Sequence, residues 1–204
     1  MELNKLEKDF PKPEAPKSNE IKDSGKKREF STGAHRDFAE GKGRMDLLPH
    51  AETNIVFNMV LDEGDKFPKS LSGVLYKALT EILIGMQNLD DETCIIRAAA
   101  LIAIAEGIHE NTKTYDVSEP NSVGMFTYGI IQVSKHYEAG AKKYGPNNWK
   151  NGMPCKVYLD SAMRHLAKSI AGMEDEPHIR AACWNLLCYL WTRKNKPELI
   201  DAEF

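Results

Sequence analysis

The chain of 204 residues is long enough to bury one substantial hydrophobic core, and 42% of its residues are hydrophobic. Its formal net charge of -3 at pH 7 offers no general electrostatic attraction to nucleic acid, so any nucleotide chemistry has to be local. The first residues are charged, and no stretch approaches the roughly 20 uncharged residues of a membrane span. We therefore expect a cytoplasmic protein with neither nucleic acid nor a membrane as partner.

Residues 1–30 contain many Lys, Glu, Asp, Pro and Ser residues and few apolar ones. Such a segment cannot bury enough surface to offset the entropy lost on ordering. The composition predicts a mobile charged tail, followed by a single domain over residues 31–204.

The next segment alternates glycines with basic residues. Gly41 and Gly43 allow positive φ angles and a close approach of the backbone to a ligand. The basic side chains of this segment are Arg36, Lys42 and Arg44. It is interpreted either as an element that closes over phosphates or as a surface turn ahead of a helix.

From residue 50 onward, apolar residues recur at helical spacing. This spacing predicts helices at about 50–62, 70–86, 91–109, 122–144, 156–171 and 176–193. No convincing hairpin signal separates them. The predicted fold class is therefore all-α, a bundle of about six helices. Its four scattered cysteines lack CxxC spacing and are expected to be reduced core thiols: Cys94, Cys155, Cys183 and Cys188.

The helix at 91–109 is apolar on nearly every side, which is typical of a central helix. Glu106 lies near its end. This carboxylate is either a metal ligand or, as we expect, part of a helix terminus that turns towards solvent.

The helix from 156 carries Asp160, Arg164 and Lys168 at four-residue spacing on one face. A carboxylate beside two cations suits a triphosphate or its metal, although the same spacing gives an ordinary exposed salt-bridge ladder. His165 points away from the apolar stripe of this helix. It is a candidate for contact with a base, a phosphate or another helix.

Three adjacent acidic residues, Glu174, Asp175 and Glu176, precede the last helix. They favour a helix N-terminus through its dipole, and they are also the hard oxygen ligands that Mg²⁺ prefers. Within that helix, His178 and Asn185 share one face, where a base edge or a ribose would satisfy them.

The helix that ends before Gly145 offers a further acidic residue. Glu138 either forms an ordinary ion pair with Lys142 or acts as a metal ligand opposite the 174–176 segment. The loop that follows offers stacking faces and amides able to recognise a purine edge, from Tyr144, Asn147, Asn148 and an exposed Trp149.

Several motifs occur in one order along the chain: Thr32–Asp37 with Gly41–Pro49, then Gly140–Gly145 with Asn148 and Trp149, then Asp160–His165, then Asp175–His178 with Trp184 and Asn185. Together they resemble the bacteriophage dATP/dGTP diphosphohydrolases, a family within the MazG-like all-α nucleotide pyrophosphohydrolases. The chain departs from shorter members by a helical insertion at about 52–127. It also lacks clear forms of the two acidic pairs, ExxE and ExxD, that are typical of the MazG-like proteins. The alternatives for one of these pairs are Glu81, Glu106 with Glu110, or Glu138.

The resemblance implies cleavage of dGTP or dATP between the α and β phosphates, dependent on Mg²⁺ or Mn²⁺, to the monophosphate and pyrophosphate. It also implies a homo-oligomer, a dimer or tetramer, and the bacterial host cytoplasm as location. The expected metal ligands are Glu138, Glu174, Asp175 and Glu176. The expected catalytic residues are Glu138, Lys142, Asp160, Arg164 and Lys168. The expected substrate-binding residues are Arg36, Lys42, Arg44, Lys143, Tyr144, Asn148, Trp149, His165, His178 and Asn185.

Other classes of triphosphate-handling enzyme are excluded by their motifs. The sequence contains no GxxxxGK[ST] phosphate loop, no His-Asp dipeptide and no GxSxG elbow. Two alternatives remain: a nucleotide-binding or virion-associated helical oligomerisation module without turnover, and a phosphoesterase for another small phosphate compound.

Overall fold

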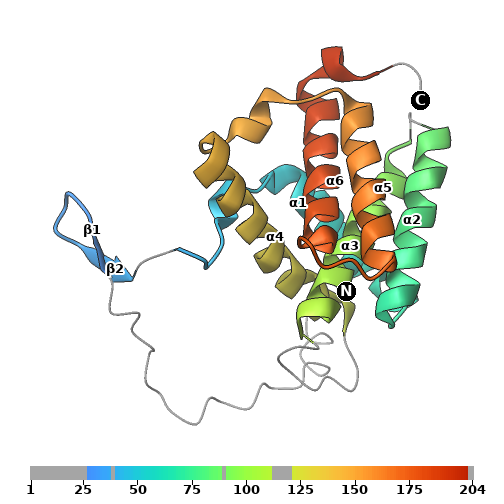
Figure 1. The fold of residues 1–204 in the computed structure, drawn as a ribbon, viewed down its shortest axis with the longest axis horizontal. Coiled ribbons are helices and arrows are strands. Elements are labelled where there is room, and N and C mark those ends of the chain that lie inside the picture. Colours follow the sequence, from blue (N-terminus) through green and yellow to red (C-terminus); the bar gives the residue numbers. More distant parts are fainter. Residues whose placement is uncertain (1–26, 38–39, 89–90, 112–120, 202–204) are drawn as a thin grey trace, which may run out of the picture. The chain divides into compact units, whose positions relative to one another are not determined.

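The computed structural model describes residues 27–37, 40–88, 91–111 and 121–201. Six α-helices dominate the described part of the chain: α1 (His50–Glu63), α2 (Leu71–Gln87), α3 (Thr93–Asn111), α4 (Ser122–Tyr144), α5 (Cys155–Ile170) and α6 (His178–Asn195) (Figure 1). Their bounds lie within two residues of the predicted ones, which confirms the all-α class. None of them, within the described ranges, combines the length and apolar character needed to cross a membrane.

Helix α3 forms the centre of the bundle. It contacts α1, α2, α4 and α6, and every residue from Ala98 to Ala105 is at most 2% exposed. The many alanines of this stretch let neighbouring helices approach from several sides. The prediction of a central helix at this position is confirmed, and the section 52–127 therefore supplies much of the core.

Helices α3 and α4 cross with their backbones in close approach. A Cβ atom added at Gly107 would overlap the carbonyl of Met125, and one at Gly129 would overlap the carbonyl of Ala103. The two backbones thus meet with no side chain between them. This contact sets the position of α4, which carries one wall of the site described below.

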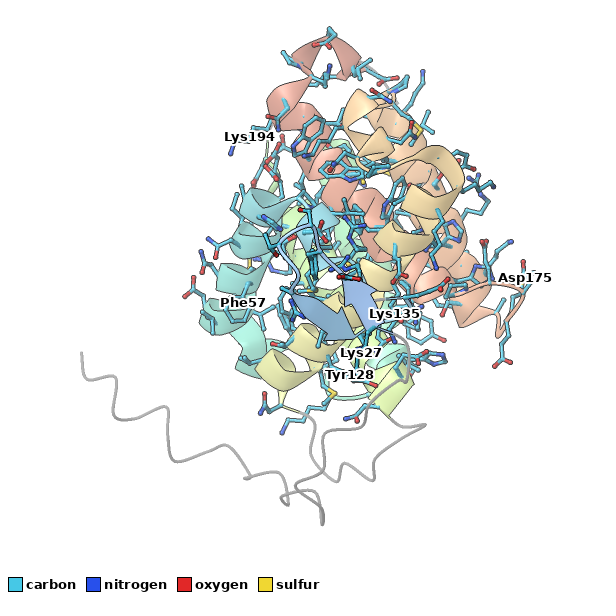
Figure 2. All side chains as sticks on the ribbon, turned by 90° about the vertical axis from the view of Figure 1, so that its left-hand side faces the viewer. Lys27, Phe57, Tyr128, Lys135, Asp175 and Lys194 are labelled. Atoms are coloured by element: carbon cyan, nitrogen blue, oxygen red, sulfur yellow. The ribbon has the colours of Figure 1, made fainter. Side chains whose placement is uncertain are left out.

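Helices α5 and α6 pack on one another and are joined by the acidic loop. Both are anchored by buried apolar side chains, among them Leu159, Leu166, Cys183, Leu186 and Leu187. Asp175 of the loop and Lys194 of α6 mark opposite ends of this helix in Figure 2. The pairing therefore holds the acidic loop at one end of the bundle.

A short hairpin precedes the helical unit, which begins at Glu40. Strand β1 (Lys27–Glu29) pairs antiparallel with β2 (His35–Asp37), and Gly33 in the turn has a φ of 80°. The last residues of the expected mobile tail thus belong to a strand, because a glycine at positive φ lets the chain reverse here. Residues 1–26 of that tail lie outside the described residues.

The four cysteines are free thiols, as predicted. Cys155, Cys183 and Cys188 are buried and Cys94 is half-buried. Burial raises the pKa of Cys155 to about 11, so this thiol is protonated and unreactive at neutral pH.

Candidate functional site

An aromatic cavity of about 510 Å³ lies beside the C-terminal half of α4. Its walls include Tyr137, Tyr144, Tyr158 and Trp184, and its rim carries the amides of Asn147, Asn148 and Asn151. Flat apolar walls with a few amides suit an aromatic base. Tyr144 is 60% exposed and offers an open ring face.

Trp149 also lines this cavity, but it is not the exposed residue that the sequence suggested. It is only 9% exposed and meets Tyr137 and Trp191 edge-on, with ring centroids 5.7 Å and 5.1 Å away. Positive φ angles at Gly145 and Asn147 turn the loop so that the indole enters the core. Trp149 therefore shapes the cavity wall.

Glu138 attaches the glycine-rich segment to α4. Its two carboxylate oxygens accept the backbone N–H groups of Gly41 and Gly43, at 2.9 and 3.0 Å, and Lys142 lies 3.3 Å away. Burial raises the pKa of Glu138, but these hydrogen bonds and Lys142 outweigh it and leave the pKa below 4.5. Both oxygens are thus engaged by the backbone of the glycine-rich segment.

The basic residues expected to bind phosphates have local partners. Arg44 binds Asp46 through two hydrogen bonds of 2.7 and 2.6 Å, and Lys142 reaches Glu40 at 2.7 Å. Lys143 lies over the ring of Tyr144. Lys42 is exposed, and Arg36 is an exposed residue of the hairpin.

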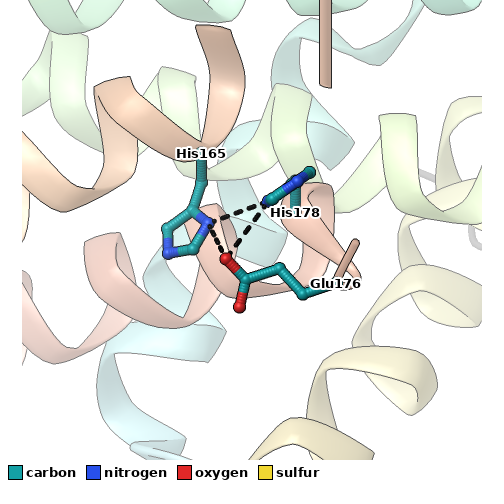
Figure 3. Close-up of side chains that lie close together, drawn as sticks. All are labelled: His165, Glu176 and His178. Carbon is teal, nitrogen blue, oxygen red and sulfur yellow. Dashed lines mark hydrogen bonds and ion pairs between the residues drawn. The ribbon is translucent and has the colours of Figure 1, made fainter. Parts of the chain in front are cut away.

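Three ligand-type side chains converge where α5, the acidic loop and α6 meet. Nδ1 of His165 lies 3.2 Å from Nδ1 of His178, and Oε1 of Glu176 lies 3.4 Å from each of them (Figure 3). Within the described ranges, this is the one group of three or more His, Cys or acidic side chains whose ligand atoms gather closely. We call it the His–Glu–His cluster.

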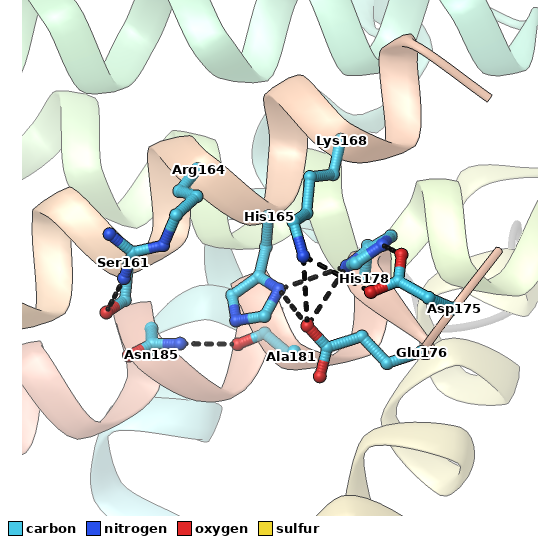
Figure 4. Close-up of polar contacts among 9 residues, drawn as sticks. All are labelled: Ser161, Arg164, His165, Lys168, Asp175, Glu176, His178, Ala181 and Asn185. Carbon is cyan, nitrogen blue, oxygen red and sulfur yellow. Dashed lines mark hydrogen bonds and ion pairs between the residues drawn. The ribbon is translucent and has the colours of Figure 1, made fainter. Parts of the chain in front are cut away.

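Two further residues support this cluster. Asp175 accepts a hydrogen bond from Nε2 of His178 at 2.8 Å, and Lys168 lies 3.3 Å from Asp175 and 3.8 Å from Glu176 (Figure 4). The hydrogen bonds from His178 and Lys168 lower the pKa of Asp175. Burial lowers the pKa of His165, against the opposing effect of Glu176, so its imidazole tends to be neutral.

Three residues expected in the site have their hydrogen-bond or ion-pair partners outside the His–Glu–His cluster. Arg164 pairs with Asp160 at 2.6 Å, and both side chains are exposed, as in an ordinary salt-bridge ladder. Asn185 is buried and donates to the carbonyl of Ala181 in its own helix, at 2.9 Å (Figure 4). Of the predicted ladder, only Lys168 reaches the acidic loop.

A second cavity, of about 600 Å³, opens beside the acidic loop. Its carboxylate side chains are Glu106, Glu110, Glu174, Asp175 and Glu176. Several carboxylates around one cavity fit a hard divalent cation such as Mg²⁺, which prefers oxygen ligands.

Glu106 is 1% exposed, so the expectation that it turns towards solvent was wrong. The guanidinium of Arg180 explains its burial. Arg180 Nε and Nη2 both lie 2.9 Å from Glu106 Oε1, and Nη2 lies 3.8 Å from Glu110. A buried carboxylate is tolerated here because α6 supplies a cation with two contacts.

His136 connects the aromatic cavity with the His–Glu–His cluster. It lines that cavity, with its ring 5.7 Å from that of Trp184. Burial lowers its pKa to about 4, and repulsion from Arg180 and His165 contributes. His136 of the aromatic cavity therefore interacts electrostatically with the His–Glu–His cluster.

Sequence reasoning did not assign His136 or Arg180 to the site. One signal for Arg180 was available, because an acidic residue in an otherwise apolar helix requires a cation if that helix is central. Nothing in the spacing indicated which helix would supply it.

Comparison with known proteins gives one match. A family model described as dATP/dGTP diphosphohydrolase, N-terminal, matches residues 97–202, about half of the chain. The matched part contains α4, α5 and α6, and with them most residues of both cavities and the whole cluster. No curated protein and no solved structure matches the chain.

Proposed function

Because the chain belongs to the dATP/dGTP diphosphohydrolase family, as its motifs predicted, we propose that it hydrolyses dGTP or dATP between the α and β phosphates. The products are the deoxynucleoside monophosphate and pyrophosphate. Membership supports hydrolysis of nucleotides in general. The choice of bond, substrate and metal is the proposal, and the residues that line the two cavities support it.

The supporting observation is that His136 lines the aromatic cavity and interacts electrostatically with His165 and Glu176 of the charged cluster. A purine stacked on Tyr144 and Trp184 fills the aromatic cavity, and its phosphates extend past His136 towards Glu176 and Lys168. With its pKa near 4, His136 is neutral at physiological pH. It then offers one donor and one acceptor to the sugar or base.

The donor set proposed for Mg²⁺ or Mn²⁺ is Glu110, Glu174 and Glu176, which line the acidic cavity. When bound, such an ion neutralises phosphate charge and makes a coordinated water more acidic. Lys168 stabilises negative charge on the leaving pyrophosphate by exchanging a carboxylate partner for a phosphate oxygen. Glu138 holds the glycine-rich segment by accepting two of that segment's backbone N–H groups. It is therefore not among the proposed metal ligands.

The direct experiment incubates the purified full chain with each of the four deoxynucleoside triphosphates and Mg²⁺ or Mn²⁺, followed by identification of the products. We expect pyrophosphate and monophosphate from dGTP, dATP or both. Release of inorganic phosphate contradicts the assignment of the bond. Tight, metal-dependent binding of dGTP without turnover supports the alternative of a non-catalytic nucleotide-binding module.

A paired substitution tests the acidic loop. Glu174→Ala combined with Glu176→Ala should abolish metal-dependent turnover and leave the helical circular dichroism unchanged, because both side chains are exposed. Asp62→Ala, which removes an exposed carboxylate of α1 outside both cavities, is the matched control. Full activity of the double variant would remove these carboxylates from the site.

We also propose that the chain forms a homo-oligomer, a dimer or tetramer. The support is an apolar face of α2, where Tyr76, Leu83 and Ile84 are exposed at helical spacing. Light scattering should give a mass that is a multiple of 23.0 kDa. Leu83→Glu with Ile84→Glu should reduce it to the monomer, and a monomeric wild type contradicts the proposal.

A further inference from the structure

The three separations in the His–Glu–His cluster match the spacing of atoms around one metal ion. They are 3.2, 3.4 and 3.4 Å between His165 Nδ1, His178 Nδ1 and Glu176 Oε1. Ligands placed tetrahedrally about 2.1 Å from an ion lie roughly 3.4 Å from each other. The side chains therefore need little rearrangement to share an ion (Figure 3).

Asp175 sets the tautomer of His178. Its Oδ1 lies 2.8 Å from Nε2 of His178, and a carboxylate at that distance requires the ring hydrogen on Nε2. The lone pair is then on Nδ1, which faces His165 and Glu176. A carboxylate that orients a histidine in this way is the usual outer partner of a histidine that binds metal.

His178 is also held in place by its surroundings, since its side chain is only 2% exposed. Without an ion, the two facing Nδ1 atoms are compatible if His165 donates its hydrogen to the lone pair of His178. Binding an ion then requires this hydrogen to move from Nδ1 to Nε2 of His165.

The charges around the cluster are compatible with one cation. Lys168 balances one of the two carboxylates of Asp175 and Glu176 and leaves one net negative charge beside the imidazoles. Glu174 lines the adjoining cavity and adds to the negative potential.

We propose that His165, Glu176 and His178 form a binding site for a divalent transition-metal ion of the Co²⁺ to Zn²⁺ type, with a further position open to water or a phosphate oxygen. Two imidazole nitrogens favour such ions over Mg²⁺ and Ca²⁺, which prefer oxygen ligands. The site goes beyond the proposed hydrolysis, because it is defined by nitrogen ligands and does not require turnover.

The test is a titration of the metal-free full chain with Co²⁺ in excess Mg²⁺ and without nucleotide. Visible absorption reports Co²⁺ held by nitrogen and oxygen ligands. We expect one ion per chain, displaced by Zn²⁺ and not by Mg²⁺. No Co²⁺ binding, or equal displacement by Mg²⁺, overturns the proposal. Because the readout is metal binding, failure of dNTP hydrolysis leaves this result unaffected.

Matched variants locate the ion. His165→Asn, at a half-buried position, should weaken Co²⁺ binding more than tenfold, and Asp175→Asn should weaken it about 10- to 100-fold through loss of the outer partner. His50→Asn, at an exposed histidine of α1, and Cys94→Ser, at the half-buried thiol, should bind as the wild type does. Wild-type affinity in both of the first two variants, or loss of binding in Cys94→Ser, overturns the assignment. His178→Asn is informative only if its thermal melt shows a folded protein, so the assignment rests on His165 and Asp175.

Discussion

At the scale of single residues, Glu106 shows what a sequence pattern can and cannot indicate. Its position in an apolar helix identified it as unusual, but its partner Arg180 is 74 positions away on another helix. Helical spacing tells which residues share one face and not which face of a distant helix lies opposite. The ion pair therefore became visible only in the packed bundle.

The Glu106–Arg180 pair should be important for stability. Arg180→Met leaves the Glu106 carboxylate buried without its main cation and should lower the free energy of unfolding by roughly 3–5 kcal/mol. Urea denaturation followed by circular dichroism measures this loss. Adding Glu106→Gln should recover much of it.

The exposed pair of Arg164 with Asp160 serves as the comparison. Arg164→Met should change stability by less than about 1 kcal/mol, because solvent screens a surface ion pair. Equal losses at both sites would show that burial does not control the strength of these pairs.

At the scale of the elements, the helices could be predicted because the apolar residues of each repeat with the helical period. The close crossing of α3 and α4 could not, since Gly107 and Gly129 look like weak helix formers in a sequence. Their role depends on backbone atoms of the other helix. In the same way, the sequence suggested Lys142 as a partner of Glu138 but gave no sign of the amides of Gly41 and Gly43.

Replacement of two glycines of α4 by alanine should change the stability of the protein in opposite directions. Gly129→Ala places a Cβ against the carbonyl of Ala103 and should destabilise the protein by about 1–3 kcal/mol. Gly140→Ala meets no atom within 4 Å and should stabilise it by about 0.5–1 kcal/mol through helix propensity. Thermal melting of both variants decides the matter, and a destabilised Gly140→Ala would contradict the open space at that position.

The attachment of the glycine-rich segment to α4 should depend on pH. The native pKa of Glu138 is below 4.5, so its stabilising effect is fully present above that value and is lost as the pH falls through the native pKa. The difference in unfolding free energy between wild type and Glu138→Gln should be constant near neutral pH and shrink in acid. A difference that grows as the pH falls would reverse this assignment.

At the scale of the whole molecule, the fold class and the family followed from the sequence, whereas the arrangement of the site followed only in part. The acidic loop, His165 and His178 were singled out, yet their joint contact depends on how α5 lies against α6. The hairpin of Lys27–Glu29 with His35–Asp37 was missed because strands of three residues carry too little alternation to be recognised.

The aromatic cavity predicts a defect confined to substrate binding. Tyr144→Ala removes an exposed stacking face and should raise the KM for dGTP about 5- to 100-fold, as expected for the loss of one base–aromatic contact. Steady-state kinetics measure it, with Leu61→Ala as a control at an exposed apolar residue outside both cavities. An unchanged KM would place the base elsewhere.

The bond pattern at Glu138 has an evolutionary consequence. Because the Glu138 carboxylate accepts main-chain N–H groups, these two hydrogen bonds do not depend on which side chain stands at position 42. Natural selection can therefore alter the residue at position 42 without removing either of them.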